Sequence, residues 1–185
     1  MQENLNKAVS RVLISEEDIA KRIKELGKEI SKDYKGTDKD IVFVGILKGS
    51  FIFMADLVKE VDLPIKVDFM SVSSYGNSTI SVGDVRILKD LEYNITGKHI
   101  IIIEDIVDTG YTLSYLKENL SSRGAESVKC CSLLNKEERR VTDAKVEYVG
   151  FEVPNEFVIG YGMDYAEKYR NLPFIGVINE DYIIN

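Results

Sequence analysis

Strand-length apolar runs alternate along this chain with segments of helix length, and this alternation limits the possible folds more than any other feature. Residues 41–47 are a continuous apolar run, residues 51–61 are long enough for a helix, and residues 66–72 carry apolar side chains at alternate positions. The pattern continues with strands at residues 99–103 and 127–134. This order predicts parallel βαβ units with right-handed crossovers. We therefore expect an α/β fold with an open sheet, whose ligands bind beyond the carboxyl ends of the strands.

Two amphipathic segments predict helices that cover this sheet. Ser15 and Asp18 form an N-terminal capping pair. Apolar residues then recur at spacings of four, three and four, on one helix face: Ile19, Ile23, Leu26 and Ile30. A later helix ends near Gly124, which suits a left-handed C-cap. Its apolar face consists of Leu113, Leu116 and Leu120. Because the run at 99–103 is apolar on both sides, we expect helices on both faces of a mostly parallel sheet.

The other segments are less regular. Residues 71–84 are polar, small and glycine-containing, so we expect an extended arm or a mobile loop there. Residues 85–91 are a weak strand. Short strand candidates lie near the end of the chain at residues 148–153, 156–160 and 174–178. No internal repeat or low-complexity linker divides residues 1–185, and we expect a single domain.

The charge balance excludes some partners. The chain has 24 Lys plus Arg against 31 Asp plus Glu, a net charge of -7, which is the wrong sign for an obligate binder of nucleic acid or anionic membranes. Its apolar runs are shorter than the ~20 residues that span a bilayer. The first residues, MQENLNK, lack a signal-peptide pattern. We expect a cytoplasmic protein that binds neither nucleic acid nor membrane.

Cysteine and histidine usage narrows the chemistry. Cys130 and Cys131 are adjacent, so on a strand they point to opposite faces, and we expect reduced packing residues. His99 is the one histidine, which excludes a multi-histidine metal site. It lies outside every motif, and we expect a strand-edge residue. Carboxylates, amines and backbone groups must carry the chemistry.

One segment, IIIIEDIVDTGYTL at 100–113, combines acids with a helix start. Glu104 and Asp105 end an apolar strand, and Asp108 follows three residues later. Backbone N–H groups and hydroxyls at a helix N-terminus suit a phosphate, and here they come from Thr109, Gly110, Tyr111 and Thr112. A sugar phosphate fits both halves, with its phosphate on the helix start and its hydroxyls on the acids. The residues equally allow a capping Asp or Thr beside solvated acids.

Five motifs in one order resemble a known family. They are GILKGS at 45–50, SSYG at 73–76, IIIIEDIVDTG at 100–110, SLLNK at 132–136 and GFEVPNEFVIGYGMDYAEKYRNLP at 150–173. The chain resembles the type I phosphoribosyltransferases, and more narrowly the hypoxanthine (guanine) phosphoribosyltransferases, over nearly its whole length.

The resemblance implies a fold and an activity. A small hood from residues 1–14 and 151–185 would cover a core of about residues 38–150. The activity would be purine salvage, with transfer of 5-phosphoribosyl from 5-phosphoribosyl-1-diphosphate to N9 of hypoxanthine or guanine. Diphosphate and IMP or GMP would be the products. Mg²⁺ would be the cofactor, and the protein would be a dimer or tetramer.

The resemblance also implies roles around the sugar phosphate. Glu104 and Asp105 match the pair that holds the ribose hydroxyls and Mg²⁺. Asp108 matches the general base or acid at N7 of the purine. The 5-phosphate would bind at Thr109, Gly110, Tyr111 and Thr112. Tyr111 stands where some relatives carry lysine, so backbone groups must replace that charge.

Other roles concern the diphosphate and a lid. Lys48 and Gly49 match the loop that meets diphosphate, where the family often has a cis peptide bond before the lysine. Arg170 matches a diphosphate contact, which its planar fork suits. Ser74 and Tyr75 match a flexible lid within residues 71–84. Without the family, an exposed amine at a strand end is the better interpretation of Lys48, and a surface ion pair is the more common role for an arginine such as Arg170.

The remaining roles concern the purine. Lys136 matches the lysine that donates to the 6-oxo group, and an ammonium, which can only donate, discriminates against 6-aminopurines. Phe157 matches the aromatic residue that stacks on the base, and Val158 contributes backbone groups that meet its edge. Asp164 matches a second residue near Mg²⁺ and the base. The alternatives are a solvated charge for Lys136 and a core position for Phe157.

Two other function classes fit part of the sequence. A regulator with the same fold would bind nucleotides and RNA, but the acidic net charge and the intact base-site motif at 157–164 count against it. A receiver-like signalling domain also has acids at a strand end. That alternative gives no reason for Lys136, Phe157 and Arg170.

Overall fold

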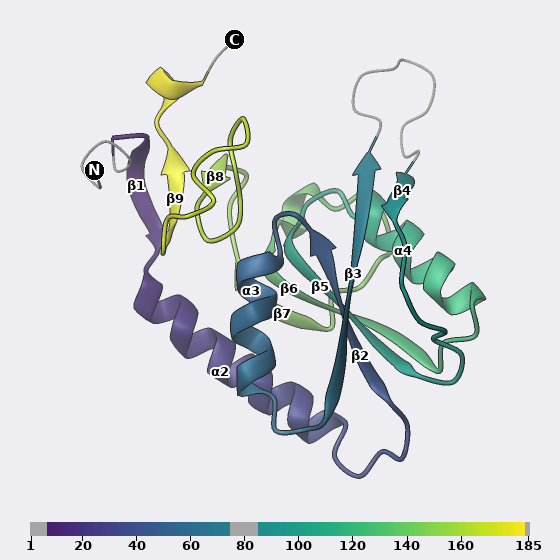
Figure 1. Ribbon diagram of the computed structural model, residues 1–185. Helices are drawn as coiled ribbons and strands as arrows, with labels where there is room; N and C mark the ends of the chain where they lie inside the picture. The colour runs from purple at the N-terminus through teal and green to yellow at the C-terminus, as the bar shows by residue number, and fades with distance from the viewer. Residues whose placement is uncertain (1–6, 75–84, 184–185) are drawn as a thin grey trace.

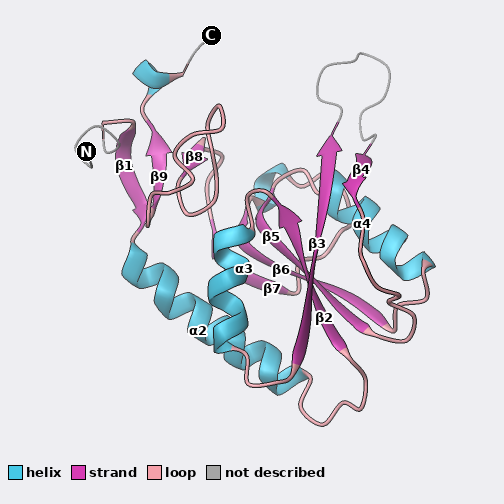
Figure 2. Cartoon of the chain, viewed as in Figure 1, coloured by secondary structure: helices cyan, strands magenta, loops and turns pink. Residues whose placement is uncertain are grey.

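A six-stranded sheet is the centre of the computed structural model, which describes residues 7–74 and 85–183 (Figures 1 and 2). The strand order is β4-β3-β2-β5-β6-β7. Its strands are β2 (Ile41–Leu47), β3 (Ile65–Ser74), β4 (Val85–Lys89), β5 (His99–Val107), β6 (Ser127–Asn135) and β7 (Tyr148–Glu152). All neighbouring pairs are parallel except β3 and β4. The predicted mostly parallel α/β sheet is confirmed.

Helices cover both faces of this sheet, as predicted. The helices are α2 (Glu16–Asp33), α3 (Phe51–Leu57) and α4 (Tyr111–Ser122). Ile101 and Ile103 of β5 pack in the core that α2 and α3 cover, whereas Ile100 and Ile102 pack in the core under α4. Alternate residues of one apolar strand therefore serve two cores, which explains why this run is apolar throughout.

The helix signals in the sequence correspond to real caps. Ser15 Oγ accepts a hydrogen bond from the backbone N–H of Asp18 at 3.1 Å and so caps α2. Gly124 follows α4 with a φ of 81°, the left-handed conformation expected of it. The segment predicted as one helix at 51–61 divides into α3 and a 3₁₀ turn at Val58–Glu60. Two further 3₁₀ turns lie at Glu137–Arg139 and Glu180–Tyr182.

A second, three-stranded sheet is built from segments near the two ends of the chain, and we call it the hood. Its strands are β1 (Val9–Ile14), β8 (Val158–Ile159) and β9 (Ile175–Ile178), in the antiparallel order β1-β9-β8. Figure 1 shows this sheet on the side of the large sheet toward which the arrows of β2 and β3 point. Only part of the strand predicted at 156–160 forms β8. The hood therefore lies near the carboxyl ends of the parallel strands.

Two expectations about the strands need correction. β5 was expected at residues 99–103 with the two acids at its end, but pairing with β6 continues it to Val107, so Glu104 and Asp105 lie within the strand. β3 continues to Ser74, so the first residues of the segment predicted as an arm or loop at 71–84 are a strand. Tyr75 and the rest of that segment lie outside the described residues, and the lid stays a prediction.

The lone histidine and the cysteines have structural environments. Cys130 and Cys131 are free and buried, one in each of the two cores, as expected of packing residues. His99 begins the interior strand β5, where its ring nitrogens contact the hydroxyls of Thr37 at 3.2 Å and Ser127 at 2.8 Å. Within residues 7–74 and 85–183, no helix is both long and apolar enough to cross a membrane.

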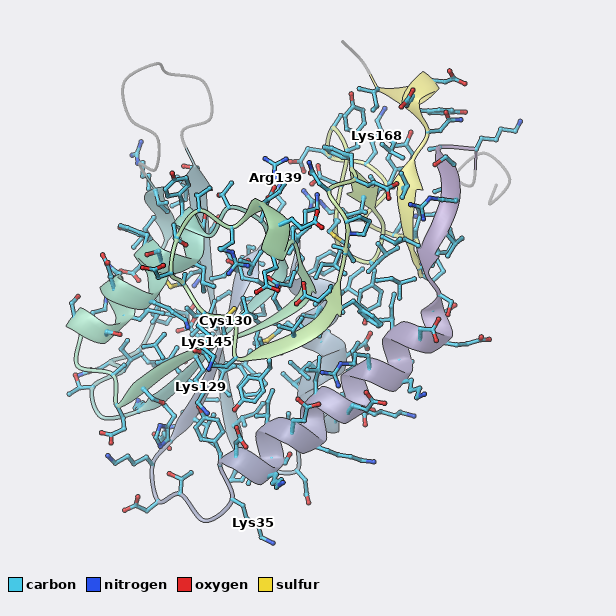
Figure 3. The ribbon with its side chains drawn as sticks, turned by 180° about the vertical axis from the view of Figure 1, so that it is seen from behind. Lys35, Lys129, Cys130, Arg139, Lys145 and Lys168 are labelled. Atoms are coloured by element: carbon cyan, nitrogen blue, oxygen red, sulfur yellow. The ribbon has the colours of Figure 1, made fainter. Side chains whose placement is uncertain are left out.

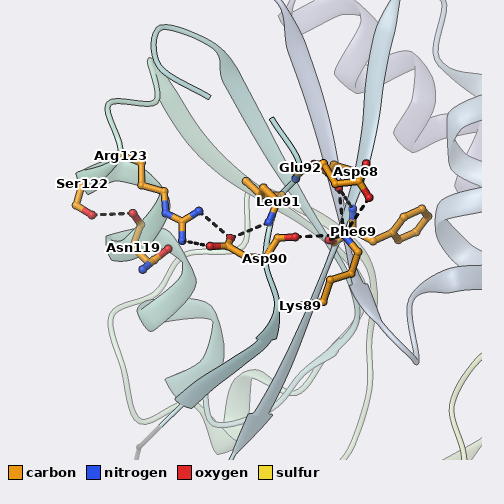
Figure 4. A network of polar contacts seen from close by, with 9 residues as sticks. All are labelled: Asp68, Phe69, Lys89, Asp90, Leu91, Glu92, Asn119, Ser122 and Arg123. Carbon is orange, nitrogen blue, oxygen red and sulfur yellow. Dashed lines mark hydrogen bonds and ion pairs between the residues drawn. The ribbon is translucent and has the colours of Figure 1, made fainter. Parts of the chain in front are cut away.

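A polar network fixes the connection between β4 and β5 (Figure 4). The buried Asp68 accepts hydrogen bonds from the backbone N–H groups of Phe69 at 2.7 Å and Glu92 at 2.8 Å. Two guanidinium nitrogens of Arg123 each lie 2.8 Å from a carboxylate oxygen of Asp90. These contacts join the edge of the sheet to the end of α4.

Candidate active site

Two adjacent acids lie near the carboxyl end of the central strand β5. The residue Glu104 is only 7% exposed. Burial raises the pKa of Glu104 well above its usual range, and the nearby charge of Asp105 adds to this effect. Burial also raises the pKa of Asp105 to about 6, although backbone N–H groups and the charge of Arg170 oppose the shift. The ionised pair would therefore be stabilised by a cation.

The chemistry of this pair fits Mg²⁺. Carboxylates are preferred magnesium ligands, and Mg²⁺ is usually held by one or two of them together with substrate oxygens. The described residues contain no group of three or more candidate ligands that could hold a metal by themselves. Asp164, the third predicted ligand, has one carboxylate oxygen 2.8 Å from Arg170 and the other 2.9 Å from the backbone N of Glu167. Glu104 and Asp105 thus suit a metal that arrives with substrate oxygens.

The loop after β5 forms a small pocket at the start of α4. Gly110 precedes the helix with a φ of 89° and provides no side-chain cap. A Cβ at this position would lie 2.3 Å from Thr142 Oγ1, so the loop requires glycine both for its backbone conformation and for space. The pocket measures about 120 Å³ and includes Glu104, Asp108, Thr109 and Thr112. The first turn of α4 can therefore offer backbone N–H groups to an anion.

Two arginines hold this loop from the segment after β6. Arg140 donates from Nε to the carbonyl oxygen of Asp108 at 3.1 Å and from another nitrogen to the carbonyl oxygen of Ala144 at 2.7 Å. Arg139 Nε lies 2.8 Å from Asp108 Oδ1. Figure 3 shows Arg139 on the side of the core that faces the hood. Neither arginine was predicted to be functional, because the run KEERR at 136–140 looks locally like a solvated charge run.

A larger pocket of about 450 Å³ opens between the end of β5 and the hood. It brings together most of the residues predicted for the purine and the acids: Asp105, Asp108, Lys136, Phe157, Val158 and Asp164. Arg139 and Met163 also line it. It shares Asp108 with the smaller pocket, so the two lie side by side.

The environments of Lys136 and Phe157 differ from those that the alternative interpretations of the sequence predict. Lys136 is 8% exposed, and its Nζ donates to the carbonyl oxygen of Glu156 at 2.8 Å. Burial lowers the pKa of Lys136, and the charge of Asp108 acts in the opposite direction. Phe157 is 52% exposed, with its ring edge-on to Tyr165 at 5.6 Å between centroids. Lys136 is therefore not a solvated charge, and Phe157 is not a core residue.

The loop after β2 packs tightly against the acids. The peptide bond between Leu47 and Lys48 is cis. A Cβ on Gly49 would lie 1.6 Å from Asp105 Oδ2, and a Cβ on Gly162 would lie 2.0 Å from the carbonyl oxygen of Gly49. Only glycine permits these approaches. The close packing places Lys48 and Gly49 beside Asp105 and beside the turn that precedes Arg170.

Lys48 and Arg170 both contact Glu167, a residue that was not predicted from the sequence. Arg170 donates to the carbonyl oxygen of Gly162 at 2.8 Å. Both cationic side chains contact Glu167, Lys48 at 2.8 Å and Arg170 at 3.5 Å. The structure thus brings the predicted diphosphate residues together on one side of Asp105. Of the predicted lid residues, Tyr75 lies outside the described residues, and Ser74 is described only as the end of β3.

Known proteins match this chain over nearly its full length. The phosphoribosyl transferase domain matches residues 13–166. The hypoxanthine-guanine phosphoribosyltransferase of Bacillus subtilis (strain 168) is 54% identical over 170 residues, which cover 92% of this chain and 93% of the relative. A corresponding protein of Streptococcus thermophilus (strain CNRZ 1066) is 51% identical over 177 residues, 96% of this chain and 97% of the relative. The crystal structure of a hypoxanthine phosphoribosyltransferase from Staphylococcus aureus superposes with a TM-score of 0.94 at 48% identity, covering 100% of both chains.

Proposed function

The chain belongs to the phosphoribosyltransferase family, and we propose that it transfers 5-phosphoribosyl from 5-phosphoribosyl-1-diphosphate to N9 of hypoxanthine or guanine. The products are IMP or GMP and diphosphate. One observation carries the proposal: the pocket of about 450 Å³ contains Asp105, Asp108 and Lys136, and it adjoins the small pocket at the start of α4, which Glu104 lines. A base, a pentose and a phosphate fit these parts in order.

The acids of β5 hold the sugar. Glu104 and Asp105 would accept hydrogen bonds from the ribose hydroxyls and would hold Mg²⁺ together with oxygens of the donor. Asp164 lines the same pocket as Asp105 from the hood. When bound, Mg²⁺ neutralises charge that develops on the departing diphosphate. The backbone N–H groups and hydroxyls at Thr109, Gly110, Tyr111 and Thr112 bind the 5-phosphate.

The diphosphate binds opposite the 5-phosphate. Lys48 and the backbone of Gly49 meet it from the loop after β2, and Arg170 meets it from the hood. Positive charge develops on the ribose as the diphosphate leaves. The carboxylates of Glu104 and Asp105 stabilise that charge, because they lie in a partly water-excluded site.

The base lies between the end of β5 and the hood. Phe157 stacks on the purine ring, and backbone groups at Val158 meet its edge. Lys136 donates to the 6-oxo oxygen, and Asp108 accepts or returns the proton at N7. The Arg139 guanidinium contacts the Asp108 carboxylate and orients it.

Lys136→Gln is expected to reduce discrimination between hypoxanthine and adenine by about 10-fold or more. An ammonium can only donate, whereas an amide can also accept from a 6-amino group, so the variant removes the mismatch that rejects adenine. The ratio of kcat/KM for the two bases measures the effect. Lys145→Gln, an exposed lysine outside both pockets, is the matched control. An unchanged ratio in Lys136→Gln would remove this lysine from base selection.

The resemblance supports three further proposals. The enzyme is cytoplasmic, it forms a dimer or tetramer, and residues 71–84, with Ser74 and Tyr75, act as a lid over the reacting atoms. Sedimentation of the purified protein gives its oligomeric state.

Nucleotide formation tests the proposed reaction directly. The protein is mixed with 5-phosphoribosyl-1-diphosphate, Mg²⁺ and each of hypoxanthine, guanine, xanthine and adenine, and absorbance follows the product. Rapid formation of IMP or GMP is expected. No turnover with any base, together with tight RNA retention in a filter-binding assay, would favour the regulatory alternative instead.

A further inference from the structure

One carboxylate oxygen contacts both cationic side chains that the proposed function assigns to the diphosphate. Glu167 Oε2 lies 2.8 Å from Lys48 Nζ and 3.5 Å from a guanidinium nitrogen of Arg170. Lys48 follows β2, whereas Arg170 lies between β8 and β9, so the contact joins two distant segments of the chain. A diphosphate oxygen would use the same donors.

The backbone conformation around Glu167 sets the direction in which its side chain points. Ala166, Glu167 and Tyr169 have φ values of 50°, 62° and 73°, which are uncommon for residues other than glycine. The N–H of Glu167 donates to Asp164 Oδ2 at 2.9 Å. This turn directs the carboxylate across the gap to the loop after β2. The position of Glu167 therefore does not depend on its ion pairs alone.

We propose that Glu167 is an internal competitor of the diphosphate group. Its carboxylate holds Lys48 and makes a longer contact with Arg170, whose nearer partner is Asp164 at 2.8 Å, until the diphosphate of the donor displaces it. It makes the same contacts again as the product diphosphate leaves. The inference rests on the proposed function, and it gives a role to a residue outside the substrate contacts assigned above. Glu167 touches no reacting atom, so it is a positioning residue.

The exposure of the Lys48–Glu167 ion pair determines how strongly Glu167 can compete with diphosphate. The side chains of Lys48 and Glu167 are each 67% exposed. Solvated ion pairs are weak and are screened by salt. Glu167 can therefore be displaced readily, yet it lowers the affinity for diphosphate in both directions of the reaction. Its loss should strengthen diphosphate binding and product inhibition without improving turnover.

Binding of inorganic diphosphate with Mg²⁺, measured by calorimetry, tests this role in four proteins. Glu167→Gln keeps the shape of the side chain and is expected to tighten binding about 3-fold relative to wild type, with a similar decrease in donor KM and no increase in kcat. Glu167→Asp keeps the charge on a shorter side chain and is expected to tighten binding less. Glu118→Gln removes an exposed charge on α4 and should change nothing. The gain in Glu167→Gln should shrink as salt rises.

Three results would overturn the inference. The first is unchanged or weaker diphosphate binding by Glu167→Gln, and the second is equal tightening by Glu118→Gln. The third is wild-type binding by Glu167→Asp, which would indicate that the charge acts through its long-range field and not through a contact that diphosphate displaces. Turnover of the wild-type protein with hypoxanthine separates this failure from a failure of the proposed function. An active wild type with an unresponsive Glu167 rejects only the inference.

Discussion

Asp108→Asn is expected to lower kcat by about 10² to 10⁴-fold and to leave the KM for the donor near its wild-type value. The asparagine has nearly the same shape, but its amide cannot accept the N7 proton. The donor should still bind, because the small pocket at the start of α4 depends on backbone groups, and Arg140 holds the carbonyl oxygen of residue 108 and not its side chain. Steady-state kinetics with hypoxanthine measures both constants.

A matched variant separates this effect from a general loss of charge. Asp143→Asn changes an exposed aspartate in the segment after β6, outside both pockets, and should keep wild-type kinetics. If Asp108→Asn also keeps its kcat, Asp108 does not move the N7 proton. If instead only its donor KM rises, Asp108 contributes to donor binding and the catalytic role belongs to another group.

Asp105→Asn is expected to stabilise the protein at neutral pH while reducing its activity. The pKa of Asp105 in the folded protein is about 6, against an ordinary value of 3.8. This difference corresponds to a cost of up to about 3 kcal/mol for the ionised side chain in the folded state. In a protein of this size the full cost would shift Tm by about 6–12 °C. Asparagine avoids that cost but loses the charge that, in the proposed function, holds Mg²⁺ and the ribose.

The pH dependence of this stability has a defined sign. Between about pH 4 and pH 6 the folded protein binds more protons at Asp105 than the unfolded chain does, so its free energy of unfolding falls as pH rises through this window. Asp105→Asn should match wild type below this window and exceed it above.

Thermal melts of both proteins from pH 4 to pH 8 test this behaviour, with the exposed Asp62→Asn as control. Added Mg²⁺ and donor should raise the Tm of wild type and not that of Asp105→Asn. Equal stability of the two proteins across the range would show that Asp105 ionises without cost.

The large sheet could be predicted because its signals are local. Apolar runs and amphipathic periods specified β2, β5, β6, α2 and α4. The strand β1 escaped prediction because its partner, β9, lies more than 160 residues later and only one of its own six residues is buried. The end of β5 was misplaced for a related reason: Glu104 and Asp105 look like the polar end of the strand, but pairing with β6 extends the strand through them to Val107.

In the candidate site, too, the residues of one local motif could be predicted, whereas contacts between distant residues could not. The acids and the start of α4 form one continuous motif, and the sequence brought them together before any fold was known. Arg139, Arg140 and Glu167 could not be predicted in this way. Their partners, Asp108 and Lys48, lie 31 to 119 positions away, and only the packing of the loops at the end of the sheet brings them into contact.

A crystal structure of the protein with bound IMP tests the central claim most directly. The account predicts the 5-phosphate in the pocket lined by Thr109, Gly110 and Thr112, with the ribose hydroxyls on Glu104 and Asp105. A phosphate bound away from the start of α4, with the ribose turned from those two carboxylates, would contradict it.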